Sequence, residues 1–260
     1  MFQLDAYKLK WVAIIAMVLN HMVVTWWDII PTWLAIPMYA AGGLTFPIMA
    51  YFVVEGYKHT SSLPRYIMRL FVVGLIALPF HFLALNLPLS GGFIGVYPLL
   101  NILFSIILSL VVLVLYDKIK FRVLFWLLYV VVIVPVSFIF FEWYFVGVTT
   151  VLLFYIIGNE SARRIVPPIV AGVLWILMSL SAGLMPVEGI DALVTDPGFI
   201  AIMPTFAIGC FAAAFLVKNF NGERGKRMKW LFYTFYPVHL AVLAGVAIAL
   251  GLLDLSIFGL

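Results

Sequence analysis

Lys10 and His21 are the first two side chains in this sequence whose types and spacing could serve chemistry. Ten residues separate them, so they are about three turns apart on one face of an α-helix, at roughly 16 Å. Lys10 is a fixed positive charge, whereas the neutral imidazole of His21 can act as a general base or as a nucleophile. The alternative is that His21 is a core histidine that bonds a neighbouring helix.

The helix that must carry this pair is an apolar run that extends to about Trp27 and is long enough to span a membrane. The rest of the chain has the same character: 66% of its 260 residues are hydrophobic and only 10% are charged. A soluble domain has about 25% charged residues. We therefore expect an all-α, polytopic membrane helical bundle that forms one domain over residues 1–260 and lies in the cell membrane.

Apolar runs of about 17–23 residues predict nine spans. They lie near residues 10–28, 34–56, 66–86, 97–116, 122–140, 143–158, 165–185, 199–217 and 230–252. All fifteen Lys and Arg residues fall at the start of the chain or after an even-numbered span. The opposite loops and the C-terminal end hold only acids, namely Asp28, Glu142, Glu188, Asp191, Asp196 and Asp254. The positive-inside rule then places the N-terminus in the cytoplasm and the C-terminus outside.

A titratable or amide side chain is costly in hydrocarbon, so within a span it usually faces the bundle interior and serves a function. The polar residues of this kind in the predicted spans are few: Asn20, His21, Glu55, His81, Asn86, Asn101 and His239. Glu55 and His59 are four residues apart and can meet at the cytoplasmic rim, as part of a site or as a structural cap. Pro237 lets the last span bend, and His239 beside it either lines a cavity or marks a packing kink.

Basic residues at the predicted inner ends of the first three spans could form an anion site. Arg65 and Arg69 share a helix face, and with Lys10 and Lys58 close by in the membrane plane they would bind phosphate well. The alternative is that these cations only anchor the spans. We expect no nucleic-acid partner, because in a membrane protein the positions of the basic residues primarily reflect the orientation of the chain in the membrane. We also expect no metal, because Cys210 has no Cys or His at metal-ligand spacing.

Short motifs along nearly the whole chain resemble the TraX family of conjugal-transfer proteins, which is linked to acetylation of pilin. These motifs are Leu9-Lys10, Asn20-His21, Phe46-Pro47-Ile48, Glu55-Gly56-Tyr57-Lys58-His59-Thr60, Tyr66-Ile67-Met68-Arg69-Leu70, Asn101-Ile102-Leu103-Phe104-Ser105 and Tyr236-Pro237-Val238-His239-Leu240. TraX is in turn similar to broader transmembrane acyltransferases, whose first helix carries a basic residue, ten others and then a histidine. Lys10 and His21 match that spacing.

This chain departs from the TraX pattern at two places and from the pattern of the broader acyltransferases at a third. Asn20 stands where the family usually has aspartate, which removes a charge beside the imidazole. Gly43 stands where the family tends to have arginine, which removes a potential ligand for a phosphate or a carbonyl. Arg65 and Arg69 are one residue further apart than the arginine pair of the broader families.

The resemblance implies a membrane acyltransferase whose donor is acetyl-CoA or another coenzyme A thioester. A cytoplasmic cofactor-binding set would hold the donor's nucleotide phosphates, and a pantetheine arm has about the reach of the gap to His21. His21 would act as general base or carry the acyl group briefly. The cofactor-binding set is Lys10, Lys58, His59, Arg65 and Arg69, and the catalytic set is His21, Asn20, Glu55, Asn101 and His239. The acceptor would be an amine or hydroxyl from outside the membrane or from within it.

The competing class is a non-enzymatic membrane protein, either a transporter or an assembly factor for a secretion or conjugation system. A proton-coupled carrier also needs buried histidine and glutamate, so these residues do not separate the two classes. Carriers often have two related halves. The sequence has no such repeat.

Overall fold

The computed structural model of the protein describes residues 4–90, 100–182, 196–226 and 228–253. These residues are helical apart from short connections and two isolated β-bridges, Leu4 with Phe220 and Leu100 with Phe141. The prediction of an all-α fold is therefore confirmed. The residues predicted to form the two largest external loops, 90–92 and 185–198, lie mostly outside the described part of the chain, as does the C-terminal end beyond residue 253.

The first four predicted spans correspond to α1 (Ala6–Thr25), to α2 (Thr32–Gly42) with α3 (Thr45–His59), to α4 (Leu63–His81) with α5 (Leu87–Ser90), and to α6 (Ile102–Lys118). The later ones correspond to α7 (Arg122–Leu128) with α8 (Val134–Phe140), to α9 (Tyr144–Ile156), to α10 (Glu160–Ala182), to α11 (Pro197–Ile202) with α12 (Phe206–Lys218), and to α13 (Lys229–Ala249). Two π-helical turns join α4 to α5 and α7 to α8, namely η2 (Phe82–Asn86) and η3 (Tyr129–Ile133). The 3₁₀ turns are η1 (Trp27–Ile29) and η5 (Met203–Thr205).

Six helical stretches of the described residues are long and apolar enough to cross a membrane. They are Ala6–Thr25, Thr32–His59, Leu63–Asn86, Glu160–Leu180, Pro197–Lys218 and Leu231–Ala249. Two further apolar helices, Arg122–Ser137 and Tyr144–Ile156, are shorter. By length and composition, these helices are those of a multi-pass membrane protein. The count of nine membrane crossings and the orientation of the chain in the membrane remain predictions.

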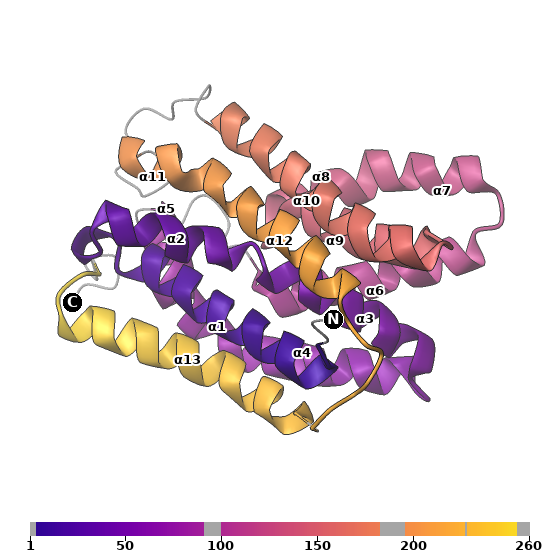
Figure 1. Cartoon of the computed structure of the whole chain (residues 1–260), viewed down its shortest axis with the longest axis horizontal. Coiled ribbons are helices and arrows are strands. Elements are labelled where there is room, and N and C mark those ends of the chain that lie inside the picture. The colour runs from indigo at the N-terminus through magenta and orange to yellow at the C-terminus, as the bar shows by residue number, and fades with distance from the viewer. Residues whose placement is uncertain (1–3, 91–99, 183–195, 227, 254–260) are drawn as a thin grey trace.

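Local sequence signals explain where α1 begins and what it joins. The carboxylate of Asp5 accepts a hydrogen bond from the Lys8 N–H at 2.8 Å and so caps the helix. Near the other end, the Thr25 hydroxyl bonds the carbonyl oxygens of His21 and of Ala84, at 2.7 and 2.8 Å. Because Ala84 lies in the π-helical turn η2, this bond ties α1 to the α4 stretch. Figure 1 shows α1 lying beside α13, and α1 also packs against α2, α3 and the π-helical turn η2.

The α2–α3 stretch crosses α12 at a contact made by two glycines. A Cβ atom added at Gly43 would lie 1.9 Å from the Phe206 carbonyl oxygen, and one added at Gly209 would lie 2.1 Å from the Ala40 carbonyl oxygen. Both obstacles are backbone atoms, which cannot turn aside as a side chain can. Close backbone approach of this kind is how membrane helices gain packing energy where the hydrophobic effect is weak.

We predict that Gly209→Ala destabilises the protein by on the order of 1–3 kcal/mol, because the added methyl group must push α2 and α12 apart. Thermal unfolding in detergent measures this as a lower Tm. Gly245→Ala in α13 is the matched control, since a Cβ there meets nothing within 4 Å. Equal stability of the two variants would contradict the close crossing.

Candidate active site

The face of α1 that carries Lys10 and His21 borders a cavity of about 350 Å³. Residues of α1, α2, α3, α4, α6, α12 and α13 line it, together with the turn before α9 and the loop before α13. Most of its wall is apolar, with side chains such as Met17, Met49 and Leu70. Because Lys10 and His21 both line it, the spacing read from the sequence does place the two side chains in one shared space.

His21 forms a buried hydrogen bond with a histidine from the far end of the chain. Its Nδ1 lies 2.9 Å from Nε2 of His239, and the two rings are nearly parallel, 5.2 Å apart between centroids. Only 5% of His21 and 7% of His239 are exposed. The bond joins α1 to α13, so His21 has the interhelical partner that the alternative reading proposed, and it lines the cavity as well.

The partners of His239 decide which nitrogen of His21 is free to react. His239 Nδ1 lies 3.0 Å from the Phe235 carbonyl oxygen, which can only accept, so this nitrogen carries a hydrogen. In the neutral ring, His239 Nε2 is then an acceptor and must receive the hydrogen on His21 Nδ1. That assignment leaves the lone pair of neutral His21 on Nε2. His21 is thus held in the tautomer that a general base needs.

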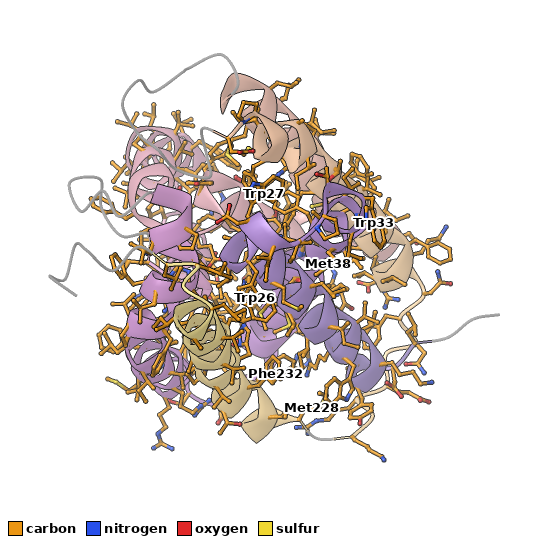
Figure 2. All side chains as sticks on the ribbon, turned by 90° about the vertical axis from the view of Figure 1, so that its left-hand side faces the viewer. Trp26, Trp27, Trp33, Met38, Met228 and Phe232 are labelled. Atoms are coloured by element: carbon orange, nitrogen blue, oxygen red, sulfur yellow. The ribbon has the colours of Figure 1, made fainter. Side chains whose placement is uncertain are left out.

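Three cations line the other part of the cavity: Lys10, Arg224 and Lys226. No Asp or Glu of the described residues forms an ion pair with any of them. The Lys10 ammonium instead lies over the rings of Phe52 and Phe232, 4.9 and 5.8 Å from their centroids. In Figure 2, Phe232 and Met228 lie at one end of the bundle, away from Trp26, Trp27 and Trp33. These three cations, called the basic rim below, leave their charge available to an anion.

The loop that supplies two of the rim cations is fastened by backbone hydrogen bonds. The Leu4 N–H donates to the Asn219 carbonyl and the Asn221 N–H donates to the Leu4 carbonyl, at 3.1 and 3.0 Å. The Arg164 guanidinium also donates to the Phe220 carbonyl at 2.7 Å. Gly225 has a φ of 61° and packs against Tyr7, so a glycine is needed where the loop passes the first turn of α1.

A carboxylate lies at the histidine end of the cavity. Glu142 lines it and accepts hydrogen bonds from the Ile102 N–H at 2.8 Å and from His81 Nε2 at 3.2 Å. The next two residues, Trp143 and Tyr144, have φ values of 64° and 46°, a left-handed backbone that costs about 1–3 kcal/mol for each non-glycine residue. This strained turn places both Glu142 and Trp143 in the cavity wall.

A family model described as TraX protein matches residues 5–247, which is nearly the whole chain. The chain belongs to the TraX family. A curated relative, the "Probable fimbrial assembly protein FimC, serogroup H1" of Dichelobacter nodosus, is 28% identical over 250 residues, covering 92% of this chain and 94% of the relative. No solved structure matches the chain.

Several of the predicted site residues of this TraX-family chain lie outside the cavity lining. Glu55 forms an ion pair with Arg163 at 3.0 Å and also contacts His59, whose Nδ1 bonds the Glu55 carbonyl at 2.9 Å. The predicted contact between Glu55 and His59 is thus confirmed, and it forms part of a bridge from α3 to α10. Lys58 is exposed, with its ammonium 5.9 Å from the ring centroid of Tyr155.

Arg65 and Arg69 are not among the lining residues either. Arg65 is exposed, whereas Arg69 Nε donates to the Tyr233 hydroxyl at 3.3 Å, and Tyr233 lines the cavity. Asn101 also lies away from the lining. It caps α6, with its oxygen accepting from the Leu103 N–H at 3.1 Å and its amide donating to the Gly74 carbonyl at 2.8 Å.

The departures from the family pattern have different surroundings. Asn20 lines the cavity beside His21, packed against Gly42. Gly43 lies at the crossing with α12, where a side chain would meet the backbone of that helix rather than the cavity. Pro237, expected to bend the last span, is accommodated within α13, which continues as an α-helix from Lys229 to Ala249.

The sequence reasoning missed Arg224, Lys226, Glu142 and Tyr236, all of which line the cavity. In the sequence, the first three are charged loop residues that indicate only the orientation of the chain in the membrane. Tyr236 carried a usable signal, because it lies three residues before His239 and therefore on the same helix face.

We predict that Met17→Cys and Met49→Cys react with the small anionic reagent 2-sulfonatoethyl methanethiosulfonate, because both positions line a cavity whose basic rim attracts anions. Labelling is measured by mass spectrometry in inside-out membrane vesicles. The natural Cys210 and the control Leu110→Cys are fully buried and stay unlabelled. Reaction at Leu110→Cys as fast as at Met17→Cys would contradict the cavity.

Proposed function

We propose that this TraX-family protein is a membrane-embedded acyltransferase that moves an acetyl or similar acyl group from a coenzyme A thioester to an amine or hydroxyl. One observation carries the proposal. A single cavity holds three cations without carboxylate partners in the described residues and, about three helical turns away, an imidazole with its basic nitrogen free.

The basic rim is the donor end of the cavity. Coenzyme A joins a nucleotide that carries several phosphates to a slender pantetheine arm that ends in the thioester. Lys10, Arg224 and Lys226 hold the phosphates, because charge-assisted hydrogen bonds to phosphate are the strong ones and no carboxylate of the described residues pairs with these cations. The apolar wall then guides the arm along α1 towards His21.

At the other end, His21 is the general base. Its Nε2 takes a proton from the acceptor amine or hydroxyl as that group attacks the thioester carbonyl carbon. The carbon–sulfur bond breaks, and His21 returns the proton to the departing sulfur to give free coenzyme A. His239 holds the imidazole in the required tautomer and is a positioning residue.

The acceptor belongs to the cell envelope. A relative that shares 28% identity over 92% of this chain is named a probable fimbrial assembly protein, which supports a role in the assembly or processing of pili or fimbriae. Glu142 and the turn before α9 lie at the end of the cavity that the charge pattern predicts to face outwards. A donor that enters from the cytoplasm and an acceptor from outside would therefore meet at His21.

We predict that Lys10→Gln and Arg224→Gln each weaken acetyl-CoA binding about tenfold or more, because each removes a charge-assisted hydrogen bond to phosphate. Isothermal titration calorimetry of the detergent-solubilised protein measures the Kd. Lys58→Gln and Arg65→Gln are matched controls, since both side chains are exposed and lie outside the cavity lining.

Equal losses in all four variants would mean that only the overall positive charge matters. No saturable binding of acetyl-CoA or coenzyme A to the wild-type protein at millimolar concentration would overturn the proposal. That result would favour a carrier or a non-enzymatic assembly factor.

We predict that His21→Ala abolishes acyl transfer, a loss of at least about 10²-fold, while the Kd for acetyl-CoA stays nearly unchanged, because the imidazole lies far from the rim. Release of the coenzyme A thiol measures the rate. His239→Phe keeps the ring but removes the acceptor for His21 Nδ1, and we expect a smaller loss of rate. Transfer by His21→Ala at the wild-type rate would remove His21 from its role.

A further inference from the structure

Two hydrogen-bond donors beside His21 come from residues that line the cavity and have no acceptor. The Tyr236 hydroxyl and the Asn20 Nδ2 are buried, and neither donates to an acceptor among the described residues, although the Tyr236 oxygen lies near the Ile102 N–H. Both residues line the cavity. Tyr236 is only 5% exposed.

Most polar groups around the two unpaired donors are hydrogen-bonded, apart from His81 Nδ1. His21 bonds His239, Glu142 accepts from the Ile102 N–H and from His81, and the Thr45 hydroxyl donates to the Ala13 carbonyl at 3.2 Å. A buried donor without a partner is destabilising, and within a bilayer no bulk water compensates for it. An oxygen atom of a bound ligand would satisfy these two donors.

The two donors come from the two helices that the His21–His239 hydrogen bond joins. Tyr236 shares a face of α13 with His239, and the two rings are 5.5 Å apart between centroids. Asn20 directly precedes His21, and Gly42 makes room for its amide, because a Cβ there would lie 2.8 Å from Nδ2. Both donors therefore belong to the end of the cavity where the base lies.

We infer that the Tyr236 hydroxyl and the Asn20 amide bind the carbonyl oxygen of the acyl thioester. This inference rests on the proposed function. When the acceptor nitrogen or oxygen bonds the carbonyl carbon, an electron pair moves onto that carbonyl oxygen, and it returns as the carbon–sulfur bond breaks. Donors fixed in advance stabilise the charge that develops on the oxygen, and one such donor contributes about 10²–10³-fold to the rate in other acyl-transfer enzymes.

This role accounts for an amide at position 20. A carboxylate in its place could only accept hydrogen bonds when ionised. The Asn20 amide can donate. The chain therefore combines the base His21 with a neutral donor on its own helix α1 and another on the adjacent helix α13.

Tyr236→Phe and Asn20→Leu test the inference with acetyl-CoA as donor and hydroxylamine as acceptor, by release of the coenzyme A thiol. Each variant should lower kcat about 10²-fold with little change in KM for acetyl-CoA, because the charge develops only in the transition state. Neither variant should lower the Tm, because no intramolecular hydrogen bond is lost.

Tyr129→Phe is the matched control. The Tyr129 hydroxyl bonds the Thr149 hydroxyl at 2.7 Å and lies outside the cavity lining, so this variant should lose stability and keep its rate. A Tyr236→Phe protein with the wild-type kcat, or with the lowered Tm expected of Tyr129→Phe, would overturn the inference. Either result would leave the proposed transferase intact if the wild-type protein releases thiol.

A second readout does not depend on turnover. Acetyl-CoA should raise the Tm of the wild-type protein more than S-ethyl-CoA does, because the thioether lacks the carbonyl oxygen. Tyr236→Phe and Asn20→Leu should reduce that difference. Equal stabilisation of the wild-type protein by both compounds would overturn the carbonyl-binding role, whereas no stabilisation by either would overturn the proposed donor itself.

Discussion

The structure depends on one constraint: a polar group buried in a membrane is destabilising unless it has a hydrogen-bond partner. Two chains of hydrogen bonds meet this requirement at the same end of the cavity. One runs from His21 through His239 to the Phe235 carbonyl and joins α1 to α13. The other runs from His81 through Glu142 to the Ile102 N–H and joins α4 to the start of α6. The same bonds that hold the helices together also orient the reactive groups.

At the end of the protein opposite the two histidines, the basic residues fall into two groups. Structural cations pair with carboxylates of the protein, whereas the cations proposed to be functional do not. Arg163 pairs with Glu55 of α3 and with Glu160, and Arg164 pairs with Glu160 of its own helix α10, at distances of 2.7–3.1 Å, so their charge is already neutralised by carboxylates. The cations of the basic rim have no such partner among the described residues, although the loop that carries two of them is fastened through its backbone. The protein therefore holds the loop in place while keeping its positive charge open to a ligand.

Most of the fold could be read from the sequence, because the signals that define it are local. Apolar runs predicted where helices lie, since burying a backbone in lipid requires helix formation within the segment itself. The spacing of Lys10 and His21 placed both on one face, because helical periodicity fixes that relation without any neighbour. The same reasoning could not tell Asn101, which caps α6, from Asn20, which lines the cavity, since both are amides at membrane-helix positions.

The sequence by itself determined an all-helical membrane chain with a lysine and a histidine on one face of its first helix. Only the tertiary structure decided which distant groups join them. His239 lies 218 residues from His21 along the chain. Arg224 and Lys226 reach the rim because the loop before α13 pairs with Leu4, and Glu142 enters the wall through a strained turn. The physical reason is that helix formation is local, whereas the neighbours of a helix face are set by packing among all the helices.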